Sequence, residues 1–327
     1  MGMMVEGEWK QRDWATDEEG RFQRSTTTFR DWIRADGSGD FPVEGDRYHL
    51  YVSYACPWAH RTLMTRTLKG LEEVVTVSVV DPYMGEEGWH FSESEGAVPD
   101  FVNDKDYLRE VYKLADDKFT GRVTVPVLWD KRESTVVNNE SIEIVRMFDT
   151  EFDELAERPE VDLYPEEQRD EIDRVIDAIY QPINNGVYRS GFAHSQKAYE
   201  EAVGELFDAL DHWESVLGDQ RYLVGEQLTE ADICMFTTLY RFDQVYHTHF
   251  KCNVRRIDDY PNLWAYAREI YQLPGIAETC NMAHIKEHYY TSHESVNPRR
   301  IIARGPDQDW EAPHGRDELP KTPLASN

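Results

Sequence analysis

Apolar residues in the first half of the chain occur in short runs that alternate with polar residues or are rich in valine, as in β-strands. Two longer segments have the features of helices. Pro57 suits a first helical turn and Gly70 a helix end, and a second helix opens near Glu140 and Ser141. This half of the chain is therefore expected to be α/β. The expected strands are residues 48–54, 73–81, 121–130 and 134–138, and the expected helices are residues 57–69 and 140–148.

The order of these elements, β-α-β-β-β-α, is that of a thioredoxin-like sheet. The valine-rich residues 73–81 are expected to form a strand that is buried on both faces. Proline interrupts the third strand at Pro126, where it removes a hydrogen-bond donor from the ladder. A cis Val125–Pro126 bond at the start of an edge strand resolves this conflict, and we predict one.

The second half of the chain has helical periodicity instead. Apolar residues recur at spacings of three and four within residues 172–179 and again within residues 203–217. Thr229 stands three residues before Asp232 and predicts a capped, buried helix. We therefore expect an all-helical second domain. The predicted organisation is an extension (1–47), a thioredoxin-like domain (48–150), a linker (151–163), a helical substrate domain (164–293) and a tail (294–327).

Composition narrows the possible partners. The 35 lysines and arginines face 63 aspartates and glutamates, so the net charge is −28 and phosphate backbones and anionic lipids are repelled. No apolar run approaches the roughly 20 residues that cross a bilayer. We expect a soluble protein that binds neither nucleic acid nor membrane. The first ten residues lack a basic region followed by an apolar block, which favours the cytoplasm. Dispersed acid with little lysine suggests a halophilic source.

The four cysteines contain no C-x-x-C pair, which argues against a zinc site and a disulfide framework. Cys56 stands between a strand and a helix, where the helix dipole lowers a thiol pKa from about 8.5 toward neutrality. Ala59 occupies the position of a second redox cysteine, so an external thiol must complete any turnover. The alternative is a small residue buried at a tight turn. Cys234, Cys252 and Cys280 are interpreted as packing residues.

Several motifs together resemble the glutathionyl-hydroquinone reductases, the Xi class of glutathione transferases. The resemblance spans about residues 5–305 and implies a cytoplasmic homodimer with a thioredoxin-like N-terminal domain and an all-helical C-terminal glutathione-transferase domain. It also implies a thiol co-substrate, glutathione or γ-glutamylcysteine, without metal or nucleotide. The motifs are Cys56-Pro57-Trp58-Ala59, Val125-Pro126, Asn139-Glu140-Ser141, Asn184-Asn185-Gly186-Val187-Tyr188 and residues 284–290, His-Ile-Lys-Glu-His-Tyr-Tyr.

The resemblance also assigns roles to individual residues. Glu140 and Ser141 are expected at the γ-glutamyl end of the thiol, and the backbone of Val125 is expected at its cysteinyl amide. The family's two tyrosines donate to the oxygen of a hydroquinone, and Tyr290 lies beside the second of them. The implied catalytic residues are Cys56, Tyr188 and Tyr289, and the implied thiol-binding residues are Trp89, Arg122, Val125, Glu140 and Ser141.

Each of these residues also has a purely structural interpretation: a helix cap, ordinary strand pairing, a loop anchor, a solvated arginine or a packed tyrosine. His60 and Arg61 are expected to point away from Cys56 on a regular helix. No metal site is predicted, although five histidines lie in the second half. They are His247, His249, His284, His288 and His293.

The predicted activity is the thiol-dependent removal of glutathione, or γ-glutamylcysteine, from a glutathionyl-hydroquinone through a mixed disulfide on Cys56. One alternative is an omega-like thiol transferase or dehydroascorbate reductase, which would use Cys56 but would not need both tyrosines. The other alternative is a non-enzymatic, transferase-like binding module, which has no use for a reactive thiol.

Overall fold

The computed structural model describes residues 2–12, 14–320 and 322, which fall into two compact units. Among the described residues, the first unit comprises residues 2–12, 14, 24–159 and 279–292, and the second comprises residues 15–23, 160–278, 293–320 and 322. In the described part of the chain, no helix is both long enough and apolar enough to cross a membrane.

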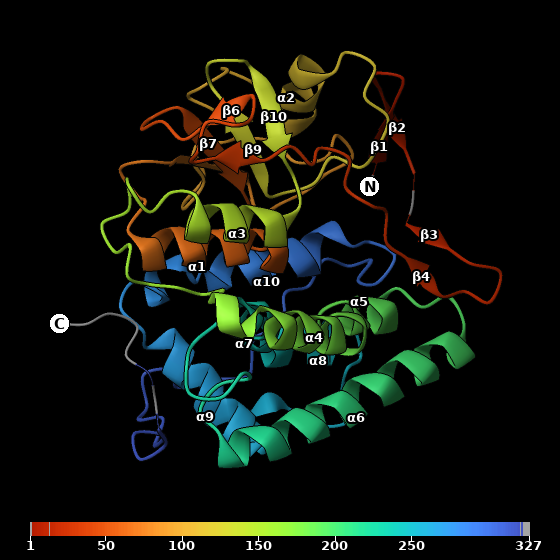
Figure 1. Cartoon of the computed structure of the whole chain (residues 1–327). Coiled ribbons are helices and arrows are strands. Elements are labelled where there is room, and N and C mark those ends of the chain that lie inside the picture. The colour runs from red at the N-terminus through yellow and green to blue at the C-terminus, as the bar shows by residue number, and fades with distance from the viewer. Residues whose placement is uncertain (1, 13, 321, 323–327) are drawn as a thin grey trace. The chain divides into compact units, whose positions relative to one another are not determined.

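The first unit is built on a four-stranded sheet in the order β10-β9-β7-β8. Strands β7 and β8 pair in parallel, whereas β9 is antiparallel to both of its neighbours, β7 and β10. Helices α1 and α3 pack against each other on one face of this sheet (Figure 1). The sheet consists of β7 (Tyr48–Val52), β8 (Thr76–Val79), β9 (Val127–Asp130) and β10 (Thr135–Asn138), and the helices are α1 (Pro57–Lys69), α2 (Leu108–Ala115), α3 (Ser141–Thr150) and α10 (Met282–Ser292).

The expected order of elements is confirmed, but the bounds of several elements differ: the strand expected over 48–54 ends at Val52, and the one expected over 121–130 begins at Val127. Helix α2 was not anticipated, and β8 is shorter than the predicted strand and half-buried at Thr76 and Val77. The Val125–Pro126 bond is cis as predicted. The expectation that Pro126 opens an edge strand was wrong, because β9 lies between β7 and β10. Pro126 costs no ladder bond there, since β9 begins only after it, at Val127.

The N-terminal residues add short strands around this sheet. Met4 and Gly121 exchange backbone hydrogen bonds of 2.9 and 3.0 Å, and the Asp31 N–H donates to the Val137 carbonyl at 3.0 Å. Much of the predicted extension is therefore tied to the segments around β9 and β10. The short strands are β1 (Gly2–Val5), β2 (Glu8–Gln11), β5 (Ile33–Arg34) and β6 (Phe41–Pro42).

The second unit is mainly helical, as its periodicity predicts. Ile172, Val175 and Ile179 form the buried stripe of α4, and the predicted capping box of Thr229 and Asp232 opens α7. Its elements are β3 (Ala15–Thr16), β4 (Phe22–Gln23), α4 (Arg169–Ile179), α5 (Gly186–Gly191), α6 (Gln196–Asp219), α7 (Glu230–Arg241), α8 (His247–His249) and α9 (Pro261–Tyr271), with 3₁₀ turns η1 (Glu166–Gln168) and η4 (Ile257–Asp259) and π-helical turns η2 (Tyr180–Asn184) and η3 (Phe242–Tyr246).

After a last 3₁₀ turn, η5 (Ala277–Thr279), the chain enters α10, which belongs to the first unit. The domain boundaries expected from the sequence stay a prediction. The described grouping nevertheless places the second tyrosine motif, residues 284–290, in the same unit as Cys56.

Candidate functional site

Three features of the first unit meet at one edge of its sheet. Strands β7 and β10 run in the same direction, because both are antiparallel to β9. The helices that follow them, α1 and α3, therefore begin at the same edge. Strand β9 runs the opposite way, so its start, just after Pro126, lies there too. The topology thus gathers a helix-start cysteine, a cis-proline and a second helix start.

Cys56 is the N-cap residue of α1 and has an extended backbone, with φ −79° and ψ 121°. A turn positions it, since the Cys56 N–H donates to the Ser53 carbonyl at 3.1 Å. Pro57 occupies the first turn of α1, where backbone N–H groups have no partner within the helix, so the missing N–H of proline costs no hydrogen bond. The thiol is half-buried and faces a helix whose first turn carries no acidic residue. This setting suits a nucleophilic thiol.

The Cys56 thiol contacts the loop that carries the cis-proline. Its Sγ donates to the Val125 carbonyl at 3.5 Å. Within the described part of the chain, the Val125 N–H has no hydrogen-bond partner. An extended peptide laid beside this loop finds a free N–H next to the thiol, as β-augmentation requires.

The start of α3 offers a polar site. Glu140 is its N-cap residue, and the Glu140 N–H donates to Asn138 Oδ1 at 2.7 Å. The Ser141 hydroxyl is buried yet has no hydrogen-bond partner among the described residues. A buried hydroxyl without a partner is costly, so its presence at a helix N-terminus points to a ligand that supplies the missing bond.

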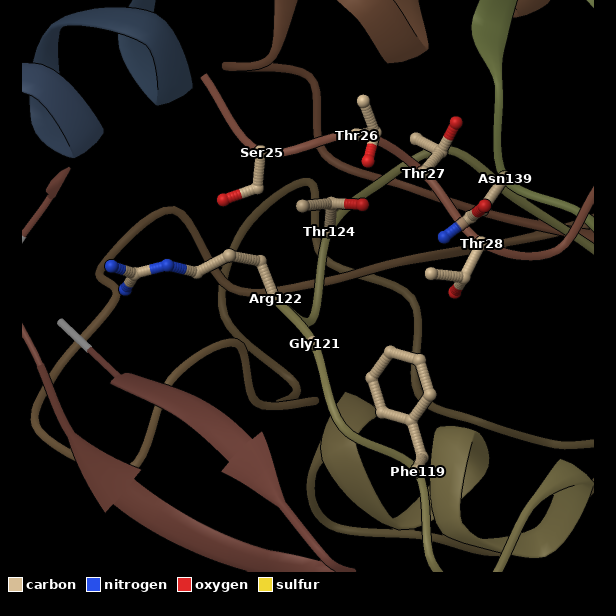
Figure 2. Close-up of a pocket in the computed structure, with 9 residues that line it drawn as sticks. All are labelled: Ser25, Thr26, Thr27, Thr28, Phe119, Gly121, Arg122, Thr124 and Asn139. Carbon is tan, nitrogen blue, oxygen red and sulfur yellow. The ribbon is translucent and has the colours of Figure 1, made fainter. Parts of the chain in front are cut away.

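A polar pocket adjoins this helix start (Figure 2). Thr27, in its wall, donates from Oγ1 to Glu140 Oε2 at 3.1 Å. The Arg122 guanidinium points away from Asn139 in this view and donates to the carbonyls of Gly2 and Arg12 at 3.1 and 2.8 Å. Arg122 thus holds the N-terminal hairpin. The lining residues are Ser25, Thr26, Thr27, Thr28, Phe119, Gly121, Arg122, Thr124 and Asn139.

Trp89 lies in the long segment between β8 and α2 and is 8 % exposed. Its ring stacks on that of His288 in α10, with centroids 4.7 Å apart and planes 22° apart. Its carbonyl accepts from the Leu108 N–H at 3.0 Å. Tyr289 and Tyr290 follow His288, and both are buried. The Tyr289 ring meets the His288 ring edge-on, with centroids 5.2 Å apart.

Tyr188 belongs to the second unit, on the short helix α5. It is 9 % exposed and packs in a cluster of rings with Phe192, Tyr246 and Phe250, at centroid distances of 5.5 to 6.3 Å. The π-helical turn η2 immediately precedes α5, and such turns are frequent at functional sites.

The other thiols differ sharply in setting. Cys234 and Cys252 are buried, and burial raises the pKa of the Cys252 thiol far above its ordinary value. Cys280 is half-buried, and its Sγ lies 3.7 Å from His60 Nε2. No sequence pattern indicates this contact, because the two residues are 220 positions apart.

His60 also contacts Thr279, whose hydroxyl lies 2.8 Å from the same ring nitrogen. Arg61 stacks on Trp58 at 4.2 Å from the ring centroid. Among the described residues, no three His, Cys, Asp or Glu side chains are grouped closely enough to hold a metal ion.

A helix-start cysteine and a cis-proline on a thioredoxin-like sheet, joined in one chain to a helical unit, define the glutathione-transferase class. Two family models agree: glutathione S-transferase, N-terminal domain, over residues 55–151, and glutathione S-transferase, C-terminal domain, over residues 196–269.

Comparisons with individual proteins identify the family within this class. The chain is 53 % identical to the glutathionyl-hydroquinone reductase YqjG of Escherichia coli over 97 % of its length and 99 % of that protein. A structure described as a Xi class GST from Natrialba magadii is 62 % identical, with a TM-score of 0.93 and 98 % of each chain covered. The glutathione-bound structure of YqjG has a TM-score of 0.89 at 50 % identity, covering 97 % of this chain and 99 % of that one. The chain belongs to the glutathionyl-hydroquinone reductases, the Xi class of glutathione transferases.

Proposed function

We propose that this protein removes the thiol from glutathionyl-hydroquinones through a mixed disulfide on Cys56. The observation that carries the proposal is the setting of that thiol: the N-cap of α1, half-buried, 3.5 Å from the carbonyl before a cis-proline. Family membership and the unpartnered Ser141 hydroxyl at the same sheet edge support it.

In the first step, the Cys56 thiolate attacks the sulfur of the conjugate. A sulfur–sulfur bond forms and the carbon–sulfur bond breaks, with its electron pair left on the ring carbon, which takes up a proton. The hydroquinone leaves, and the thiol stays on Cys56 as a mixed disulfide. We propose Tyr188 and Tyr289 as the phenols that donate to the hydroquinone oxygen while charge develops on it.

In the second step, a free thiol attacks the mixed disulfide. The disulfide of the two thiols leaves and the Cys56 thiolate is restored, so one free thiol is consumed for each hydroquinone released, and the second sulfur of the disulfide comes from the conjugate. The external thiol is required because Ala59 stands where a resolving cysteine would lie.

We propose that the γ-glutamyl end of the thiol lies at the start of α3. The Ser141 hydroxyl and the free amides of the helix suit its carboxylate, and Glu140 suits its ammonium group. The free Val125 N–H suits the cysteinyl carbonyl. Trp89 is proposed as the ring that covers the bound thiol.

The identity of the thiol depends on the third residue of the tripeptide. γ-Glutamylcysteine lacks the glycine, whose carboxylate is the group of glutathione that an arginine such as Arg122 could bind. In this structure the Arg122 guanidinium is hydrogen-bonded to Gly2 and Arg12. We therefore propose that either thiol serves. Comparable kcat/KM values for the two reductants are expected, and a large preference for glutathione would contradict this.

The mechanism is tested by mass spectrometry of the full-length protein incubated with a glutathionyl-hydroquinone and no reductant. One glutathione adduct on Cys56 and one equivalent of hydroquinone are expected. Cys56→Ala should form no adduct and show no turnover, whereas Cys280→Ala, which removes the other half-buried thiol, should behave like the wild type. Turnover by Cys56→Ala would exclude the mechanism. Reduction of dehydroascorbate with no activity on the conjugate would favour the omega-like alternative.

We further propose a cytoplasmic homodimer from a halophilic source. The reducing thiol pool that the second step needs supports the location, and the net charge of −28 together with the similarity to the Natrialba magadii structure supports the source. Sedimentation in high potassium chloride tests the dimer.

A further inference from the structure

Three side chains of α10 form a stripe that binds the backbone of the segment carrying Trp89. His284, His288 and Ser292 are spaced by four residues and so lie one above another on a helix. His284 Nε2 lies 2.6 Å from the Glu95 carbonyl. His288 Nδ1 lies 3.0 Å from the Pro82 carbonyl. The Ser292 hydroxyl accepts from the Met84 N–H at 2.9 Å.

These bonds fix the tautomer of each ring. A carbonyl only accepts, so the proton of His284 is on Nε2 and that of His288 is on Nδ1. Gly96 shows how closely the segment approaches α10, because a Cβ at this position would lie 2.7 Å from His284 Nε2. The backbone at Gly96 also has φ +82°, which favours glycine.

The middle member of the stripe touches two candidate site residues. The His288 ring stacks on Trp89 and meets Tyr289 edge-on at 79°. His288 is 6 % exposed, and its neighbours include both rings and the Pro82 carbonyl of the segment. A single imidazole therefore contacts both the indole and the phenol.

We propose that His288 is a positioning residue that keeps the rings of Trp89 and Tyr289 in a fixed position relative to each other. His284 and Ser292 assist by binding the backbone of the same segment to α10. This rests on the proposed function, in which Trp89 covers the thiol and Tyr289 faces the hydroquinone oxygen. Histidine suits the role because it combines a flat ring for stacking with an N–H in the ring plane for the carbonyl of Pro82.

The test compares His288→Ala, which removes both ring and donor, with His288→Phe, which keeps a ring for stacking. We expect His288→Ala to raise the KM for glutathione about tenfold, the effect of roughly one lost interaction of 1.4 kcal/mol, and to lower kcat. His288→Phe should recover most of the KM. His212→Ala is the control, since that exposed histidine also contacts a tryptophan ring, Trp213, but lies on α6.

Amide hydrogen exchange over residues 82–96 supplies a readout of the segment itself. Faster exchange in His288→Ala, together with the raised KM, supports the proposal. Faster exchange with an unchanged KM would show a purely structural role and overturn it, as would failure of the phenylalanine to recover the KM.

If His288→Ala does not fold, Ser292→Ala decides instead. It removes only the acceptor for the Met84 N–H. It should quicken exchange at Met84 and raise the KM for glutathione severalfold, and an unchanged KM would overturn the proposal. Failure of the proposed function is recognised separately, because it requires turnover by Cys56→Ala, which no outcome of the His288 series produces.

Discussion

At the scale of single residues, the cysteines differ in burial and in their place in the fold. Cys252 is enclosed, and its burial disfavours the thiolate. Cys56 is half-buried at the N-cap of α1, whose first turn carries no acidic residue. The same side chain is thus a packing residue in one place and a candidate nucleophile in another.

The buried hydroxyl of Ser141 gives the first prediction. Ser141→Ala removes a group that has no partner in the described structure, so the free energy of unfolding should stay constant or rise by up to about 1 kcal/mol. The KM for the thiol should rise about tenfold, because the bond to the ligand is lost. Urea unfolding and steady-state kinetics measure the two effects.

Ser195→Ala is the matched control. The Ser195 hydroxyl caps α6 and accepts from the Ala198 N–H at 3.1 Å. Its loss should cost about 1 kcal/mol of stability and leave the KM unchanged. A loss of stability in Ser141→Ala with an unaltered KM would mean that Ser141 is a structural residue.

The tyrosines give the second prediction. Tyr188→Phe and Tyr289→Phe should each lower kcat about a hundredfold with little change in KM, because in the proposed mechanism each phenol acts only as charge develops on the hydroquinone oxygen. Tyr290→Phe decides which of the two neighbours faces the site. Tyr199→Phe is the control. Tyr199 lies on α6, and its hydroxyl donates to the Lys251 carbonyl, so this variant also loses a phenol hydrogen bond but at a residue with no proposed catalytic role. Full activity of both main variants would favour the omega-like alternative.

At the scale of elements, the directions of β7, β9 and β10 bring the candidate groups together. Sequence spacing alone separates Cys56, Val125 and Ser141 by up to 85 positions, yet the ladder places both helix starts at one edge. In the second unit, hydrogen bonds at the start of α7 join several segments, because the Asp232 carboxylate accepts from four donors. They are the N–H groups of Leu223 and Thr229 and the hydroxyls of Thr229 and Tyr266.

This cap gives the third prediction. Asp232→Ala should lower the free energy of unfolding by about 2–4 kcal/mol at pH 7, because it removes a cap and leaves buried donors unpaired. Burial raises the pKa of Asp232 to about 6, although the four donors oppose the rise. A carboxyl whose folded-state pKa exceeds its unfolded value of 3.8 contributes most to the free energy of unfolding at low pH. That stabilising contribution is lost as the pH rises from 3.8 through about 6.

The penalty of Asp232→Ala should therefore be larger at pH 5 than at pH 7, as measured by urea unfolding at both values. Asp219→Ala, an exposed acid at the end of α6, should change stability by less than about 0.5 kcal/mol. A penalty that grows as pH rises would mean that the hydrogen bonds outweigh burial and that the pKa is lowered.

At the scale of the whole molecule, 28 uncompensated negative charges repel one another. The Debye length falls from about 10 Å at 0.1 M salt to about 3 Å at 1 M, so this repulsion is removed by salt. The fourth prediction is that the urea midpoint rises between 0.1 and 2 M potassium chloride. A midpoint that falls or stays constant would argue against adaptation to high salt.

A charge-reduced variant is the control for that experiment. Glu166, Glu167 and Asp170 are exposed around the start of α4. Replacing them with Gln, Gln and Asn should flatten the salt dependence, because fewer charges remain to be screened. An equally steep dependence would point to a general salt effect on apolar burial.

Local sequence determined the helix start at Cys56, the end at Gly70, the cis bond before Pro126 and the cap at Thr229, because each depends on neighbours within a few positions. The family resemblance was also carried by short motifs. Periodicity did not reveal that α10 joins the sheet unit, because an apolar stripe does not say which surface it will cover.

Tertiary structure alone decided the contacts between distant segments. Only the fold shows that Arg122 holds the N-terminal hairpin and that Cys280 lies beside His60. The same holds for the stacking of His288 on Trp89. The sequence determines local geometry through steric and hydrogen-bonding preferences of a few adjacent residues. Contacts between residues 100 or 200 positions apart depend on how the whole chain packs, and no local preference encodes them.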